Sequence, residues 1–140
     1  MDKFKEIRPI VLGVAIRDGK LLVSQGYDSK KNNYFYRCIG GGIEFQETSE
    51  QALKREFMEE LKIEIDIKKF LGVCENIFTY EGKAGHEIVF FYQIDIPEKY
   101  YQVRYFQDED GDPGEAIWVD VQDFKNKSKI LYPEEIFKYI

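Results

Sequence analysis

Hydrophobic and polar residues alternate in short stretches along the N-terminal part of the chain. Residues 11–16 and 21–24 are rich in aliphatic and β-branched residues, and Asp18-Gly19 between them is a frequent hairpin turn. A polar loop, DSKKNN, then precedes the aromatic stretch at residues 34–39. The pattern predicts a hairpin over residues 11–24, followed by a further short strand.

The period of the pattern changes to that of a helix after three consecutive glycines at residues 40–42. Leu53, Phe57 and Leu61 are spaced four residues apart, so they share one face of a helix. Thr48 is a favoured N-cap residue, and Gln51 follows it at the spacing of a capping box. We therefore expect a helix from Thr48 to about Leu61.

Strand-like patterns dominate the rest of the chain. Residues 63–80 and 86–96 are rich in β-branched and aromatic residues, with a turn at EGKAG between them. The acidic loop QDEDGDPGE precedes a strand at residues 116–121, and Pro133 opens a final short helix. Strands on both sides of one helix, with another helix at the end, predict an α/β fold with a mixed sheet, formed as a single domain over residues 1–140.

Composition narrows the class of protein. Hydrophobic residues make up 44% of the 140 residues and charged residues 33%, as is usual for a soluble globular protein. The charged N-terminus is unlike a secretory signal, and no apolar run approaches the roughly 18 residues of a membrane span. Cys38 and Cys74 are far apart and form no CxxC pair, so we expect reduced thiols in a cytoplasmic protein that does not bind membranes.

The formal net charge of -6 argues against nucleic acid as a partner, because affinity for nucleic acid depends on basic residues that neutralise phosphates. A small anionic substrate remains compatible with this charge. It would need a metal ion or local basic residues to offset the carboxylates.

Three glutamates on the predicted helix are candidates for such a metal site. Successive helical residues turn by about 100°, so Glu60 lies about 40° to one side of Glu56 and Glu59 about 60° to the other. Like charges at this spacing destabilise a helix, and a Mg²⁺ ion, which prefers oxygen ligands, would remove the repulsion. The alternative is a solvated acidic helix face. The preceding glycines favour the metal, because they let the backbone approach a ligand without a Cβ in the way.

The number of residues between the glycines and the acidic residues of the predicted helix matches a known sequence motif. Five residues separate Gly41 from Glu47, seven separate Glu47 from Arg55, and the sequence EFMEE follows. This resembles the Nudix box of the MutT-like Nudix hydrolases: glycine, five residues, glutamate, seven residues, then REUxEExGU, where U is a bulky apolar residue. The matching residues are Gly41, Glu47, Arg55, Glu56, Phe57, Glu59, Glu60 and Ile63. Lys62 departs from the pattern, since the family usually has glycine there, at a position where left-handed helix caps are common.

The resemblance implies the Nudix fold, an α/β/α sandwich with a mixed sheet, and a metal centre. Glu56, Glu59 and Glu60 correspond to the ligands of Mg²⁺, with Mn²⁺ as a substitute, and the backbone carbonyl of Gly41 corresponds to a fourth ligand. Glu47 and Arg55 correspond to a structural salt bridge between the loop and the helix.

The resemblance also implies a reaction. Nudix hydrolases cleave a diphosphate linkage in a nucleoside diphosphate linked to another group, by attack of water on phosphorus. The general base differs among members, so that Glu56, Glu59 or a carboxylate from a later loop could act as the base here. Homodimers are common in the family, and the implied partner is a small-molecule nucleotide.

Four residues outside the box are further candidates for substrate or metal binding. Asp110 and Glu115 lie in the acidic loop before the tryptophan-bearing strand, where several family members have an extra ligand or base; the alternative is a solvated turn. Arg37 precedes the glycines and could reach a phosphate, although exposed strand arginines are common. Glu87 could face the same site from an alternating strand.

Two other functions compete with a Mg²⁺-dependent pyrophosphohydrolase. A catalytically silent Nudix domain could bind a nucleotide as a sensor, but such a domain is favoured by a lost box glutamate, and all three remain. An acidic protein-interaction domain leaves the glycine and arginine spacing unexplained. At the level of substrate, the lack of an extra N-terminal region favours a nucleoside triphosphate or small nucleotide derivative, with ADP-ribose or a sugar nucleotide as the alternative.

Overall fold

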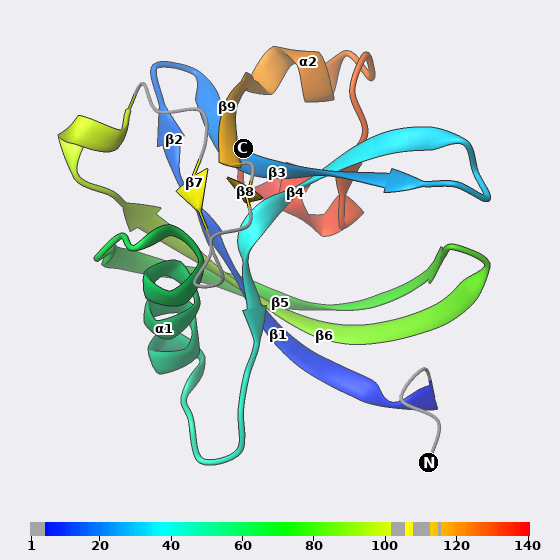
Figure 1. Cartoon of the computed structure of the whole chain (residues 1–140), viewed down its shortest axis with the longest axis horizontal. Helices are drawn as coiled ribbons and strands as arrows, with labels where there is room; N and C mark the ends of the chain where they lie inside the picture. The colour runs from blue at the N-terminus through cyan, green and yellow to red at the C-terminus, as the bar shows by residue number, and fades with distance from the viewer. Residues whose placement is uncertain (1–4, 102–105, 108–112, 115) are drawn as a thin grey trace.

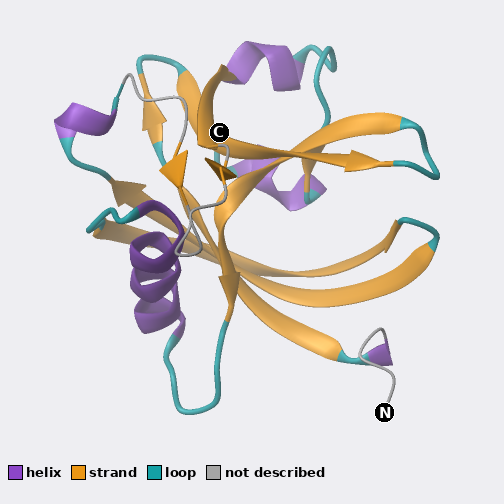
Figure 2. Cartoon of the chain, viewed as in Figure 1, coloured by secondary structure: helices purple, strands orange, loops and turns teal. Residues whose placement is uncertain are grey.

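The structure is a computed structural model that describes residues 5–101, 106–107, 113–114 and 116–140. Strands predominate, and one helix of 13 residues interrupts them (Figures 1 and 2). The elements in chain order are β1 (Ile7–Val14), β2 (Ile16–Arg17), β3 (Lys20–Asp28), β4 (Asn33–Gly42), α1 (Ser49–Leu61), β5 (Asp66–Tyr80), β6 (Lys83–Asp95), η2 (Glu98–Tyr100), β7 (Phe106–Gln107), β8 (Pro113–Gly114), β9 (Ala116–Asp120), α2 (Val121–Lys125), β10 (Leu131–Tyr132) and η3 (Glu134–Lys138).

The main sheet is mixed, with the strand order β2-β3-β4-β1-β6-β5. β1 pairs with β6 in parallel and with β4 in antiparallel orientation. β9 joins the sheet beside β3, and β10 joins it beside β4. The mixed sheet and its helices confirm the predicted α/β class.

The strand that carries the glycines changes its partner along its length. The first part of β4, from Asn33 to Cys38, pairs with β3, whereas Ile39 to Gly42 pair with β1. The sheet is therefore curled, and the β3–β4 and β5–β6 hairpins project together on the side away from α1 (Figure 1). The end of β4 delivers the three glycines to the loop before α1.

Apolar side chains fill a core on each side of the curled sheet. One core contains the buried face of α1, including Leu53 and Phe57. The other contains Phe124 of α2 and Ile136 of η3. Helices thus cover the sheet on two sides, as the sandwich architecture requires (Figure 2).

Helix α1 begins and ends as its sequence predicts. The Thr48 side chain accepts a hydrogen bond from the backbone of Gln51, whose side chain accepts one from the backbone of Thr48, so the capping box is confirmed. At the other end, Lys62 adopts the left-handed conformation, with φ 57° and ψ 33°. The lysine therefore takes the cap conformation for which glycine is usually selected.

The predicted N-terminal hairpin is partly wrong. The turn at Asp18-Gly19 is present, but it joins only the two-residue strand β2 to β3. Residues 11–14 belong to β1, which pairs with β4 and β6 instead. These residues form a central strand that is buried on both faces, and a short hairpin could not provide that burial.

The C-terminal part has several short elements that were not predicted, among them η2, β10 and α2. The strand predicted to reach residue 121 ends at Asp120, which caps the unpredicted helix α2 by accepting a hydrogen bond from the Gln122 backbone. The helix after Pro133 is present as the 3₁₀ helix η3. Among the described residues, no helix is long and apolar enough to cross a membrane.

Candidate active site

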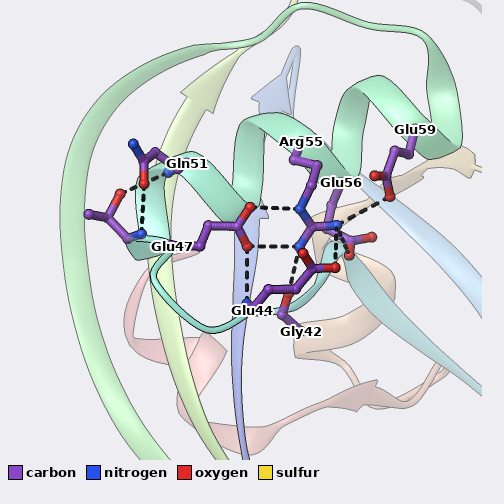
Figure 3. A network of polar contacts seen from close by, with 8 residues as sticks. Gly42, Glu44, Glu47, Gln51, Arg55, Glu56 and Glu59 are labelled. Atoms are coloured by element: carbon purple, nitrogen blue, oxygen red, sulfur yellow. Dashed lines mark hydrogen bonds and ion pairs between the residues drawn. The ribbon is translucent and has the colours of Figure 1, made fainter.

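Arg55 joins the glycine loop to helix α1. Its guanidinium donates to both carboxylate oxygens of Glu47, at 2.7 and 2.9 Å, and to the backbone carbonyl of Gly42, at 2.9 Å (Figure 3). Glu47 in turn accepts a hydrogen bond from the backbone of Glu44. Together these bonds hold the loop in one conformation, as expected for the predicted structural salt bridge.

The shifted pKa values of Glu47 and Arg55 favour the charged form of both side chains. The hydrogen bonds from Arg55 lower the pKa of the Glu47 carboxyl to about 2, and the same bonds raise the pKa of Arg55 above its ordinary value. Both groups therefore remain charged throughout the neutral pH range, so the link between loop and helix persists there.

Two of the three candidate metal ligands contact the same arginine, and the third contacts one of these two. The Arg55 Nη1 atom donates to Glu56 at 2.9 Å and to Glu59 at 3.2 Å, so one guanidinium connects two of the carboxylates (Figure 3). Glu60 makes a hydrogen bond with Glu56. Burial, together with that bond and the nearby carboxylates, raises the pKa of the Glu60 carboxyl to about 8.

The distances between these carboxylates determine whether a metal ion fits among them. Within the described residues, no three acidic, cysteine or histidine side chains are already gathered as a complete metal site. Glu56 and Glu60 nevertheless lie within hydrogen-bonding distance of each other, and a carboxylate pair that close requires a shared proton or a cation between its members. The donor set therefore fits a hard divalent cation such as Mg²⁺, which would take the place of the proton.

The glycines bring the strand close to these side chains. A Cβ atom added to Gly41 would lie 2.4 Å from the carboxyl carbon of Glu56, so a larger residue could not occupy this position without displacing that carboxylate. A Cβ on Gly40 would lie 1.9 Å from the Val11 carbonyl oxygen of the paired strand. Gly42 has more space, since the nearest atom would be the Arg8 guanidinium at 3.4 Å.

A family model for the NUDIX domain matches residues 7–139, which is nearly the whole chain. The chain belongs to the NUDIX family. The predicted resemblance, the predicted fold and the prediction of an enzyme of the Nudix hydrolase class are thereby confirmed. The Nudix box lies on the end of β4, the following loop and α1, as the spacing of its residues requires.

Solved structures with the same fold include several Nudix proteins. The E. coli ORF135 protein, known from a solution structure, matches with a TM-score of 0.64 and 21% identity, over 94% of this chain and 84% of that one. A NUDIX hydrolase from Nitrosomonas europaea matches with a TM-score of 0.61 and 17% identity, over 95% and 85% of the two chains. A MutT NUDIX hydrolase from Burkholderia pseudomallei gives 0.59 and 20%, over 86% and 88%. No curated protein sequence matches the chain.

A cleft of about 370 Å³ lies beside the Nudix box. Glu60 and the three glycines line one part of it, and Arg37 and Glu87 line another. The two latter residues, which the sequence indicated separately, form a salt bridge of 2.6 Å. Arg37 therefore lies in the cleft with its charge already partly balanced. Asp110 and Glu115, the other two candidates, lie outside the described residues.

Two features of the cleft were not apparent from the sequence. Arg8 of β1 lines the cleft near Gly42, and it lies beside Glu87 in the parallel register of β1 and β6. The Gly42 carbonyl is an acceptor for Arg55. The opposite charges of Arg8 and Glu87 are compatible with neighbouring positions in the sheet. They indicate that Arg8 lies at the cleft only once the pairing of β1 with β6 is known.

We expect Glu47→Gln to lower the melting temperature near neutral pH by about 3 °C or more, because glutamine cannot replace the charge-assisted bonds to Arg55. The pKa of Glu47 lies near 2 in the folded protein, below the ordinary value of 4.5. The carboxylate therefore stabilises the fold above about pH 4.5, and this contribution is lost as the pH falls toward 2.

Thermal melts of wild type and variant between pH 7 and pH 2.5 test this expectation, with exposed Glu64→Gln as the matched control. The difference in melting temperature should shrink over the lower part of that interval. A difference independent of pH would contradict the role assigned to the ion pair.

Proposed function

We propose that this Nudix protein hydrolyses a diphosphate linkage in a nucleoside diphosphate linked to another group, in a reaction that requires Mg²⁺. The observation that carries the proposal is the position of the Glu56 carboxyl, which lies against Gly41 and beside the carboxyl of Glu60, next to a cleft that also contains Arg8 and Arg37. Acidic groups for a cation and basic groups for phosphate oxygens thus adjoin one another.

The proposed Mg²⁺ ligands are the carboxylates of Glu56, Glu59 and Glu60 and the backbone carbonyl of Gly41. When bound, the ion neutralises charge on the phosphate oxygens and lowers the pKa of coordinated water. Mn²⁺ takes oxygen ligands of the same kind and is expected to substitute.

The residues around the ligands have distinct proposed roles. Arg55 fixes Glu56 and Glu59 by donating to both, so that neither carboxylate needs to be reoriented before reaction. Arg37 and Arg8 attract the phosphate chain into the cleft. Glu56 or Glu59 accepts the proton of the attacking water. Glu59 is the more exposed of the two, with 43% of its side chain accessible against 15% for Glu56.

The proposed substrate is a nucleoside triphosphate or a small nucleotide derivative, with ADP-ribose or a sugar nucleotide as the alternative. The cytoplasm, where nucleotides and Mg²⁺ occur together, is the proposed location. Both cysteines are free thiols, as expected in a reducing compartment.

A nucleotide panel assayed with Mg²⁺, with Mn²⁺ and with chelator tests the proposal. Hydrolysis that depends on the metal is expected, and the release of phosphate, pyrophosphate or a sugar phosphate identifies the bond that is cut. Binding of nucleotides without turnover in either metal would instead indicate the sensor function.

A further inference from the structure

Glu87 of β6 is a buried carboxylate at the edge of the cleft. Its exposed fraction is 4%, and Asp28 is the only other buried charged residue in the part of the chain that the structure describes. A buried carboxylate is costly unless it is paired and hydrogen-bonded. Glu87 lines both the cleft of the Nudix box and a second cavity of about 440 Å³ between the β3–β4 and β5–β6 hairpins (Figure 1). Its partners therefore lie where these two cavities adjoin.

The curled sheet brings three polar residues to Glu87 from three different strands. Arg8 of β1 and Asn76 of β5 are its neighbours in the registers of β6 with β1 and with β5. Arg37 of β4 donates from Nη2 to Glu87 Oε1 at 2.6 Å, and the Asn76 amide donates to the same oxygen at 3.4 Å. Among the described residues, Arg37 is the only one that forms a salt bridge with Glu87. Arg8, although adjacent in the sheet, is not bonded to it.

The bond to Glu87 keeps Arg37 in one place. It is the only hydrogen bond that the Arg37 side chain makes with the described residues, and the Arg37 Nε atom is buried without a partner among them. An unpaired buried donor is costly, so this is not the conformation that best satisfies Arg37 by itself. The charge-assisted bond to Glu87 maintains it. In this conformation 28% of the Arg37 side chain is accessible, and the residue lines the cleft that also contains Glu60.

We propose that Glu87 is a positioning residue: together with Asn76, it fixes the Arg37 guanidinium at the cleft and does not itself contact the substrate. The inference rests on the proposed nucleotide hydrolysis, in which Arg37 attracts the phosphate chain. A guanidinium that is already oriented loses less conformational freedom when it binds a phosphate, and affinity improves accordingly. A carboxylate in direct contact with that phosphate would repel it, so the favourable effect of Glu87 is exerted through Arg37.

Two substitutions of Glu87 distinguish positioning from a simple effect of charge. If Glu87 acted only through its charge, its neutralisation would strengthen the binding of an anionic substrate. We expect the reverse: Glu87→Gln should lower kcat/KM by about tenfold, because a neutral amide holds Arg37 less strongly. Glu87→Asp keeps the charge but is too short to reach Arg37, and should cause a similar loss. Most of the loss should be a higher KM, since a phosphate is present in both the ground state and the transition state.

A double-mutant cycle distinguishes positioning from direct contact with the substrate. Arg37→Ala alone should lower kcat/KM by about 10–100-fold, the loss expected for a hydrogen bond to a charged group. In that background Glu87→Gln should have no further effect or should raise kcat/KM, because an unpaired carboxylate then only repels the phosphate. Asn76→Ala should cost about threefold, again only where Arg37 is present. In an Arg8→Ala background, by contrast, the tenfold effect of Glu87→Gln should persist.

Exposed Glu75→Gln, on the strand next to Glu87, is the matched control and should retain wild-type kinetics. Thermal melts show whether each variant is folded, and Asn76→Ala takes the place of Glu87→Gln in the cycle if the latter does not fold. A loss on Glu87→Gln that persists in Arg37→Ala would assign Glu87 to the substrate and overturn the inference. An unchanged or raised kcat/KM for Glu87→Gln alone would also overturn it. Both results leave the proposed hydrolysis intact.

Binding of methylenediphosphonate, a diphosphate that is not hydrolysed, tests the inference if the wild type hydrolyses no nucleotide. The wild type, Glu87→Gln, Arg37→Ala and the double variant are titrated calorimetrically in Mg²⁺. Weaker binding in Glu87→Gln, together with equal binding in Arg37→Ala and the double variant, would uphold the positioning role without turnover. Equal binding by all four proteins, or no binding by the wild type, would overturn it.

Discussion

Glu56→Gln and Glu60→Gln are each expected to reduce metal-dependent nucleotide hydrolysis by at least about 100-fold. Each substitution keeps the size of the side chain but removes a negative charge from the group proposed to hold Mg²⁺. Glu56 has a second role, since it lies against Gly41 and accepts a hydrogen bond from Arg55. Its replacement should therefore be at least as severe as that of Glu60.

The same two variants should fold as well as the wild type in the absence of metal. Without a cation the Glu56 and Glu60 carboxyls must share a proton near neutral pH, and an amide at either position removes the cost of taking up that proton on folding. Melting temperatures in chelator should equal or exceed that of the wild type, and the stabilisation on adding Mg²⁺ should be lost. Steady-state kinetics and thermal melts measure the two effects.

Glu50→Gln is the control for these variants, because Glu50 is exposed on the first turn of the same helix. It should retain full activity. Unchanged Mg²⁺-dependent hydrolysis in both Glu56→Gln and Glu60→Gln would refute the proposed metal site.

The parts of the site that depend on local sequence were predictable. The capping box of Thr48 fixes the start of α1, and the helical period then fixes where Arg55 and the glutamates project. Because Glu47 is only one residue before the cap, its ion pair with Arg55 follows from loop and helix alone. The sequence left the end of the helix open, because Lys62 replaces the usual glycine, and Lys62 takes the left-handed cap conformation all the same.

The parts that depend on strand pairing were not predictable to the same degree. The contact of Arg37 with Glu87 requires β4 to change partners and β1 to pair in parallel with β6, and no local pattern specifies either. The burial of residues 11–14 was an available signal, since a continuous apolar run is typical of a strand covered on both faces. The five residues of α2 are too few to show a helical period, although Asp120 is a favoured cap residue.

Replacement of each of the three glycines by alanine is expected to have a different effect on stability and activity. Gly40→Ala places a Cβ against the Val11 carbonyl oxygen in the β1–β4 ladder, and neither backbone can move without breaking that pairing. Overpacking of this kind costs about 3 kcal/mol or more, so the melting temperature should fall by about 10 °C. Gly42→Ala meets only the end of the flexible Arg8 side chain and keeps the carbonyl that binds Arg55, so it should resemble the wild type.

Gly41→Ala should affect activity far more than stability. Its Cβ would lie 2.4 Å from the Glu56 carboxyl carbon, which is attached to a side chain that can rotate away. The fold therefore tolerates the substitution, but the carboxylate leaves its position beside Glu60. A displacement of about 1 Å in a catalytic group costs about 100-fold in rate, and we expect a loss of that size in kcat/KM with a melting temperature within about 3 °C of the wild type. Measured together, the two quantities should rank Gly40→Ala as the least stable variant and Gly41→Ala as the least active folded one. A Gly41→Ala protein with normal hydrolysis would show that the position of Glu56 against this glycine has no part in the reaction.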